Sequence, residues 1–258
     1  MCLILIAWRV HADYPCVIAA NRDEFHSRPT ATAQWWPGDS GVLAGRDLQA
    51  GGTWLGITRA GRFAALTNYR GPGGQVTATP SRGTLVAEFL EQGTPLPVSL
   101  AQVAQRGAHC NPFNLIASDG PGLGVYASTT GETRALAPGI YALSNHLLDT
   151  PWPKVRVAKS RLATALAALP GTSALLELLR DDTPASDEQL PRTGVSIEYE
   201  RLLSSAFIRG ASYGTRSSTI VTIASDRGVS FGEWTWNPAG ALDGSSHFAF
   251  ELAIPPHP

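Results

Sequence analysis

The chain contains 258 residues, 20 basic and 21 acidic, so its formal net charge is -1. A balance so near neutrality excludes the basic excess typical of nucleic-acid-binding proteins, and no nucleic-acid partner is expected. Because 43% of the residues are hydrophobic, the chain can bury a large core, which excludes disorder as its main state. The length fits one domain, and we expect a single domain over residues 1–258.

The N-terminal segment is apolar at residues 3–8 but far shorter than the ~20 residues that cross a bilayer. No basic region precedes it and no small-residue cleavage site follows it, so we expect a cytoplasmic location without membrane insertion. Cys2, Cys16 and Cys110 form no disulfide framework, and no Cys-x-x-Cys pair indicates zinc.

Two predicted hairpins come before the first predicted helix. The run at 3–8 predicts a strand buried on both faces, and a polar turn joins it to a second strand at 16–20. Residues 26–52 are predicted to be irregular. A second hairpin is expected at 53–58 and 62–67, a loop at 69–80, and a helix at 84–92 with Ser81 as its N-cap.

Helices and strands then follow in separate groups. We expect a helix at about 98–107, strands at 113–118, 124–127 and 140–144, helices at 154–168 and 173–180, and strands at 217–224, 229–236 and 247–252. Strands at both ends with helices between them indicate an α+β fold, in which helices cover antiparallel sheets.

Cys2 is the first candidate for chemistry. Removal of the initiator methionine, which we expect before so small a residue, would leave a thiol and a free α-amine on Cys2. With an ordinary pKa of ~7.7–8.0, that amine can act as a base without a histidine. The alternative is that Cys2 is a small hydrophobic residue in a buried strand.

A polar cluster follows the second strand at Asn21, Arg22, Asp23 and Glu24. Such a cluster can orient an α-amine, bind a substrate carboxylate or amide, and shift the pKa of a thiol. It can equally be a solvated strand end with an internal ion pair. Asn21 and Asp23 share one face of an extended strand, and Arg22 and Glu24 share the other. Only one pair can face Cys2 unless a bulge intervenes.

Two asparagines, Asn68 and Asn145, each follow an apolar strand and a hydroxyl residue. An asparagine amide in this position can donate to an oxyanion during acyl transfer, although asparagine is also common in ordinary turns. Arg216 precedes an apolar strand and could bind an anionic part of a substrate or be an edge charge.

No metal or cofactor is expected, because the histidines and cysteines lack ligand spacing. The glycine pair at Gly51 and Gly52 lacks the strand-to-helix context of a phosphate loop.

Several motifs together resemble the NRDE family, which includes the homologues of transport and Golgi organisation protein 2. They are Met-Cys before an apolar strand, AANRDEF at 19–25, RP at 28–29, GGTWLG at 51–56, ALTNY at 65–69 and YGTR at 213–216. The motifs span roughly residues 1 to 224. The family is in turn similar to N-terminal nucleophile hydrolases of the penicillin V acylase and bile salt hydrolase type.

This resemblance implies a four-layer α-β-β-α sandwich of two antiparallel sheets, with Cys2 as nucleophile. Glu24, or as the second choice Asp23, takes the place of the catalytic aspartate in those hydrolases. Asn68 takes the place of the oxyanion asparagine, and Asn145 that of the second asparagine. Their arginine has Asn21 in its place here, and Arg22 follows one residue later, on the other face of a regular strand. Arg216 is therefore a candidate for the missing positive charge.

Two functions follow from the resemblance. The first is a cysteine hydrolase of linear, non-peptide carbon–nitrogen amide bonds in a small-molecule substrate, through a thioester on Cys2. The alternative is a non-catalytic carrier that uses the hydrolase fold to bind a hydrophobic ligand such as haem, a lipid or acyl-CoA. The hydrolase is favoured because candidates for nucleophile, base and oxyanion donor are all present.

Overall fold

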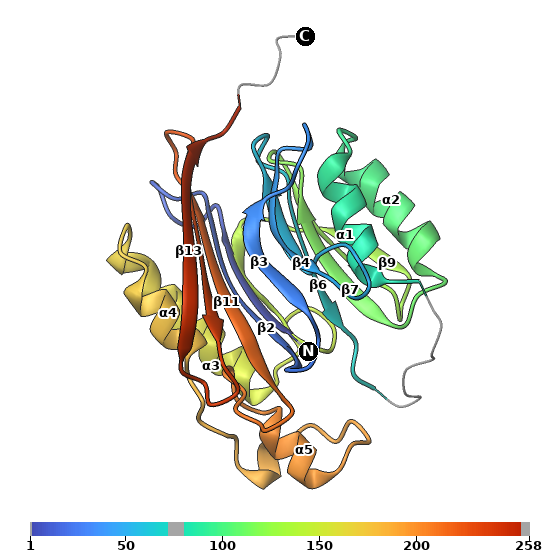
Figure 1. Ribbon diagram of the computed structural model, residues 1–258, viewed down its shortest axis with the longest axis vertical. Coiled ribbons are helices and arrows are strands. Elements are labelled where there is room, and N and C mark those ends of the chain that lie inside the picture. Colours follow the sequence, from blue (N-terminus) through green and yellow to red (C-terminus); the bar gives the residue numbers. More distant parts are fainter. Residues whose placement is uncertain (1, 72–79, 254–258) are drawn as a thin grey trace.

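Two antiparallel sheets face each other in the computed structural model, which describes residues 2–71 and 80–253 (Figure 1). Met1 and residues 72–79, most of the expected loop at 69–80, lie outside the described residues, as do residues 254–258. The first sheet has the order β10-β1-β2-β11-β12-β13. Its strands are β1 (Cys2–Trp8), β2 (Cys16–Phe25), β10 (Gly139–Leu143), β11 (Tyr213–Ile223), β12 (Gly228–Trp236) and β13 (Leu242–Glu251).

The second sheet runs from β3 to β9 in chain order. Its strands are β3 (Thr30–Trp35), β4 (Val42–Asp47), β5 (Leu55–Thr58), β6 (Phe63–Asn68), β7 (Phe113–Ser118), β8 (Leu123–Ala127) and β9 (Glu132–Ala135).

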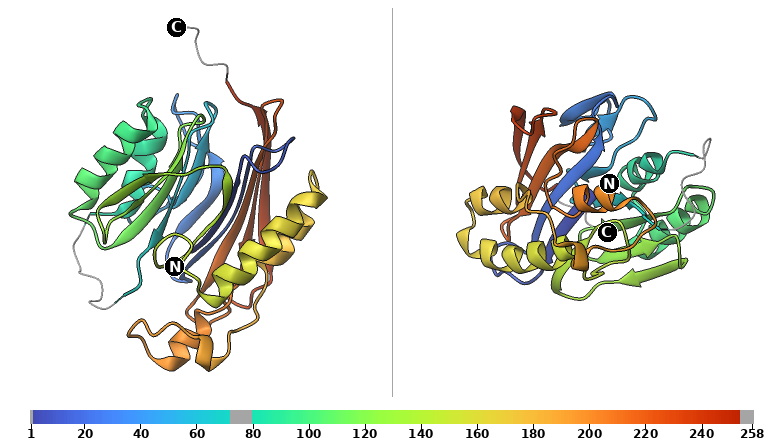
Figure 2. Two further views of the ribbon diagram at one scale, coloured as in Figure 1. Left: turned by 180° about the vertical axis from the view of Figure 1, so that it is seen from behind. Right: turned by 90° about the horizontal axis from the view of Figure 1, so that it is seen from below.

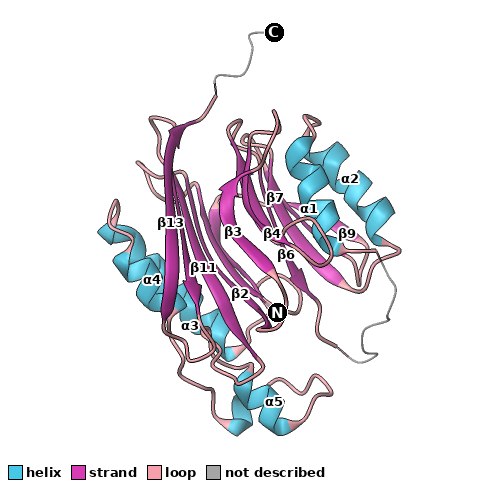
Figure 3. Cartoon of the chain, in the orientation of Figure 1, coloured by secondary structure: helices cyan, strands magenta, loops and turns pink. Residues whose placement is uncertain are grey.

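Helices cover the outer faces of both sheets (Figures 2 and 3). α1 (Arg82–Glu91) and α2 (Leu96–Gly107) pack on the second sheet, whereas α3 (Pro153–Ala165) and α4 (Ser173–Leu179) pack on the first. α5 (Ile197–Leu202) lies beyond one end of the first sheet, and short 3-10 helices span Leu166–Ala168 and Asp187–Gln189. The four-layer α-β-β-α sandwich and the α+β class are therefore confirmed.

Apolar side chains on both faces of β1 explain this layering. Ile4 and Ile6 point into the core between the sheets, and Leu3 and Leu5 point into the core beneath α3 and α4. Every residue of β1 is buried, as expected for a strand covered on both faces.

The expectation that residues 26–52 are irregular is wrong, because they contain β3 and β4. A register shift between Ala31 and Gln34 interrupts the β3–β4 ladder, so the apolar residues do not alternate cleanly. β9 and α5 were also not predicted. All four residues of β9 are exposed, and α5 is short with Glu200 as its one buried residue, so neither carries a strong apolar pattern.

A cross-sheet hydrogen bond joins β3 to β12. The Ala33 N–H donates to Glu233 Oε1 over 2.6 Å, and both residues are buried. Burial raises the pKa of Glu233 to about 7, although Ala33 and Arg22 oppose the shift. Below about pH 7, the protonated carboxyl is therefore the favoured form of Glu233 in the folded state.

We predict that Glu233 makes the protein less stable as the pH rises. Because its folded pKa lies above its unfolded pKa, its contribution is complete below about pH 4.5 and is lost as the pH passes 7. Between pH 5 and pH 8, the free energy of unfolding measured in urea should fall by roughly 2–3 kcal/mol more in wild type than in Glu233→Gln. Equal losses in the two proteins would contradict this assignment.

Candidate active site

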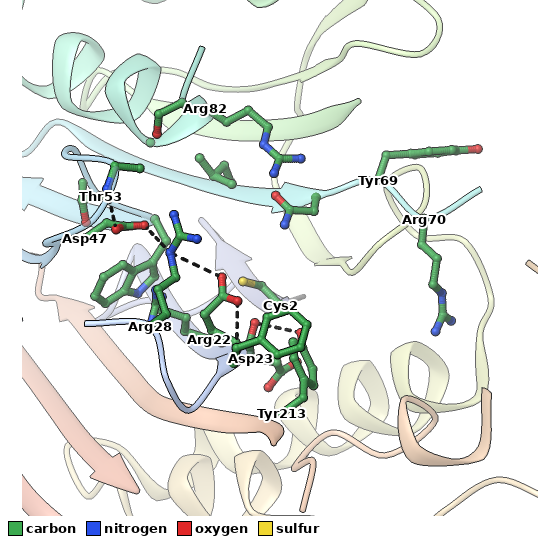
Figure 4. Close-up of a pocket in the computed structure, with 18 of the residues that line it drawn as sticks. Cys2, Arg22, Asp23, Arg28, Asp47, Thr53, Tyr69, Arg70, Arg82 and Tyr213 are labelled. Atoms are coloured by element: carbon green, nitrogen blue, oxygen red, sulfur yellow. Dashed lines mark hydrogen bonds and ion pairs between the residues drawn. The ribbon is translucent and has the colours of Figure 1, made fainter. Parts of the chain in front are cut away.

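Cys2 lies at the floor of a cavity of about 720 Å³ at one end of the sandwich (Figure 4). β1 and β2 pair so that Cys2 stands opposite Arg22. Directly opposed residues of antiparallel strands project to the same face, so both side chains point between the sheets. Cys2 is 9% exposed, and burial raises the pKa of its thiol. The Asp23 backbone N–H, which donates to the sulfur, and the Arg22 charge oppose this shift.

This register answers the question of which polar pair shares a face with Cys2. Arg22 and Glu24 share the face of Cys2. The one-residue displacement of the arginine was expected to place its guanidinium on the face away from the thiol, and this expectation is wrong. Arg22 is buried, with its guanidinium carbon 4.2 Å from the centre of the Trp54 ring and its Nη1 donating to Thr30 Oγ1 over 3.1 Å. The bulge lies in the neighbouring strand β11, between Thr215 and Ser217.

Asp23 projects toward the helices on the other face of β2 and also lines the cavity. Its Oδ1 accepts from Thr215 Oγ1 over 2.7 Å, and its carbonyl accepts from the Tyr213 hydroxyl over 2.9 Å. Burial raises the pKa of Asp23, and the nearby Lys154 and Thr215 counteract that effect. Asp23 is thus held rigidly beside the start of β1.

Asn21 does not line the large cavity. Its Nδ2 donates to the carbonyls of Leu179 and Ala206 over 2.7 and 2.8 Å, and its Oδ1 accepts from Ser218 Oγ over 2.6 Å. These bonds attach the end of α4 and the segment before β11 to the first sheet. Asn21 therefore occupies a structural position.

The two asparagines occupy different positions. Asn68 ends β6 and lines the cavity with Cys2. Asn145 is fully buried outside the cavity lining, and its Nδ2 donates to the Asn68 carbonyl over 2.8 Å. Asn145 thus fixes the backbone of Asn68.

Arg216 also lies outside the cavity lining. Its Nη1 donates to the carbonyls of Phe25, His26 and Arg28, and so supports the turn that follows β2. Of the predicted site residues, Cys2, Arg22, Asp23, Glu24 and Asn68 line one cavity. Asn21, Asn145 and Arg216 surround it.

Several site residues were not predicted from the sequence. Lys154 is buried on α3, and its Nζ donates to the Leu203 carbonyl over 3.0 Å. Burial lowers the pKa of Lys154 to about 8, and the charge of Asp23 opposes this. Its place among apolar residues, as one of only two lysines in the chain, was the available signal.

Arginines and aromatic residues complete the cavity wall. Arg70 forms a buried ion pair with Glu200 at 3.5 Å and stacks over Trp152. The other lining residues not predicted include Arg28, Asp47, Arg82, Tyr199 and Tyr213. These side chains come from distant segments, so sequence proximity could not group them.

Among residues 2–71 and 80–253, no group of three His, Cys, Asp or Glu side chains is arranged to hold a metal ion. Within the same ranges, no helix is long and apolar enough to cross a membrane.

The sequence was compared with models of known protein families and with known proteins. The family model described as "Transport and Golgi organisation 2" matches residues 1–238. The chain belongs to the transport and Golgi organisation 2 family. It is 39% identical over 241 residues to the Bos taurus transport and Golgi organization protein 2 homolog, covering 85% of this chain and 86% of the relative. The Homo sapiens homolog is 38% identical over 240 residues with the same coverage.

Solved structures give a weaker likeness. A Caenorhabditis elegans ortholog of N-acylethanolamine-hydrolyzing acid amidase has a TM-score of 0.47 and 10% identity, over 84% of this chain and 91% of that one. A C2A mutant of the conjugated bile acid hydrolase from Clostridium perfringens has a TM-score of 0.45 and 12% identity, over 98% and 92%. Likeness at this level carries no argument about function.

We predict that Asn21→Leu destabilises the protein by about 2–4 kcal/mol, because it removes two donors and one acceptor from buried partners. Urea unfolding measures the loss. Asn68→Ala, at a half-buried strand end, should change stability by less than about 1 kcal/mol. An Asn21→Leu protein as stable as wild type would contradict the structural assignment of Asn21.

Proposed function

We propose that the protein is a cysteine hydrolase that cleaves non-peptide amide bonds through a thioester on Cys2. The observation that carries the proposal is that the Cys2 thiol and the Asn68 side chain line one cavity, beside the rigidly held Asp23. A nucleophile, a donor for the oxyanion and a carboxylate that can orient an amine are the parts that acyl transfer requires.

The first step forms the thioester. Once Met1 has been removed, the Cys2 α-amine takes the thiol proton as the sulfur attacks the substrate carbonyl carbon. The amide of Asn68 donates to the resulting oxyanion. When the carbon–nitrogen bond breaks, the α-ammonium returns its proton to the departing amine. Since burial raises the thiol pKa, this route requires the amine as a base during attack.

The second step regenerates the enzyme. A water molecule gives a proton to the α-amine and attacks the thioester carbonyl carbon, and the second oxyanion again accepts from Asn68. As the carbon–sulfur bond breaks, the α-ammonium returns its proton to the departing sulfur, which restores the thiol and the free amine and releases a carboxylic acid. We assign Asp23, rather than Glu24, to orient the α-amine, because Thr215 holds its Oδ1 and the positive charge of Lys154 favours its ionised form. Glu24 Oε1 accepts from the Phe25 N–H instead.

We predict that Cys2→Ala abolishes hydrolysis of a panel of N-acyl amides and leaves the urea unfolding midpoint nearly unchanged. Cys2→Ser should keep a trace of activity, because a hydroxyl is a poorer nucleophile beside the same amine. Intact-mass measurement of each preparation should show that Met1 has been lost, since a retained Met1 would block the proposed base.

The carrier alternative gives the opposite result. For a carrier, the ligand affinities of Cys2→Ala and wild type would differ by no more than a few-fold. Wild type would turn over no amide in the panel. That pair of results would overturn the proposed hydrolase.

A further inference from the structure

Arg22 and Arg82 are the two cations of the cavity lining that have no carboxylate within 4 Å among the described residues. Arg22 stacks over the Trp54 ring and donates to Thr30 Oγ1. Arg28 Nε donates to Asp47 Oδ2 over 2.8 Å, and Arg70 pairs with Glu200. The Arg22 charge is balanced electrostatically by Glu24 and Asp47. Among the described residues, Arg82 makes one long hydrogen bond, from Nη1 to the Pro112 carbonyl over 3.4 Å.

The sequence around Arg82 offers no further counter-charge. No acidic residue lies between Asp47 and Glu88, and Glu88 pairs with Arg106 on the outer side of α1. Burial of the guanidinium lowers the pKa of Arg82, and Cys110 and Glu24 oppose this shift from beyond ion-pair distance. A guanidinium in this state gains by binding an anion.

Close backbone packing fixes Arg82 at the cavity wall. Gly52 has a φ of +72°, and a Cβ there would lie 2.3 Å from the Gly83 carbonyl carbon and oxygen. The Thr53 N–H also donates to the Gly83 carbonyl over 3.1 Å. The glycine pair of the GGTWLG motif therefore allows the loop before β5 to hold the amino end of α1 beside the cavity.

Arg28 faces the same space from another wall. Its Nε donates to Asp47 Oδ2 over 2.8 Å and lies 3.9 Å from Glu24 Oε2, whereas the structure records no hydrogen bond from its terminal nitrogens to a described residue. Figure 4 shows Arg28 and Arg82 extending toward the part of the cavity beside Cys2. Two guanidinium groups arranged in this way can bind one carboxylate or phosphate together.

The remaining wall is apolar and belongs to the side of the first sheet. Phe25, Val195, Tyr199 and Tyr213 line it, and Phe25 packs edge-on against Tyr213. An acyl group fits against these side chains. The cavity therefore has Arg82 on the side of α1 and these apolar and aromatic side chains on the side of α5, next to the Arg70–Glu200 ion pair.

We infer that Arg28 and Arg82 form a subsite for a carboxylate or phosphate group of the ligand. The ligand would carry this group on its amine portion and an acyl group on the opposite side of the scissile bond. This inference rests on the proposed function for the identity of the scissile bond. The subsite itself is a property of the cavity, and binding can be tested without turnover.

Alkylation of Cys2 by a matched pair of reagents tests the charge at the reacting atom. Iodoacetate is anionic and iodoacetamide is neutral. The rate of alkylation by iodoacetate divided by the rate by iodoacetamide at Cys2 therefore reports attraction of an anion. We expect Arg82→Gln to lower this ratio about tenfold, the loss of one charge-assisted contact. Arg82→Lys should retain most of it. Arg134→Gln, which removes an exposed charge on β9 outside the cavity, should leave it unchanged.

Equilibrium binding to Cys2→Ala tests the ligand class directly. The probes are N-octanoylglycine against N-octanoylglycinamide, and N-octanoyl-O-phosphoethanolamine against N-octanoylethanolamine. We expect the anionic member of at least one pair to bind about tenfold more tightly, and Arg82→Gln in the same background to remove the preference. A preference within the first pair identifies a carboxylate ligand, and a preference within the second a phosphate ligand.

Equal binding within both pairs, no binding of any probe, or an equal loss for anionic and neutral probes in Arg82→Gln would overturn the inference. A charge preference in Cys2→Ala, with no amide turned over by wild type, would refute the hydrolase and retain the subsite. Turnover without a charge preference would refute the subsite and retain the hydrolase.

Discussion

Pairing between Cys2 and Arg22 at the end of the β1–β2 ladder determines which side chains can reach the thiol. A shift of one residue would turn Cys2 toward α3 and exchange the apolar residues of β1 between two different cores. Burial of both faces therefore makes such a shift costly. The same packing that stabilises the sandwich holds the thiol at the open end, where the cavity lies.

The charged residues of the site lie on two different sides of β2. Asp23 and Lys154 lie on the helix side, where burial shifts both pKa values toward the neutral forms and each charge opposes the shift of the other. Arg22 and Glu24 lie on the side between the sheets. In the proposed mechanism Asp23 orients the α-amine from the helix side, whereas Arg22 lies on the same side of β2 as the thiol.

The sequence predicts β1 and α1 to α4 because β1 is a continuous apolar run and the helices repeat apolar residues at helical spacing, whereas the four layers were expected from the family resemblance. It predicts β3, β9 and α5 poorly, since a bulge or high exposure weakens their patterns. Cys2, Arg22, Asp23, Glu24 and Asn68 could be identified from strand ends. Strand ends alone could not separate Asn68, which lines the cavity, from Asn145, which binds its carbonyl. Arg82 enters the site through the contact of Gly52 with Gly83, which only the tertiary structure reveals.

Acylation of Cys2 is the central claim, and its most direct test uses p-nitrophenyl octanoate as an activated acyl donor. The mature protein would be mixed with the ester, quenched in acid to keep the α-amine protonated, and digested for peptide mass mapping. The account predicts one octanoyl group on the peptide that begins with Cys2, absent from Cys2→Ala. Labelling confined to Cys110 or other residues, or an acyl group on the N-terminal peptide that persists in Cys2→Ala, would contradict it.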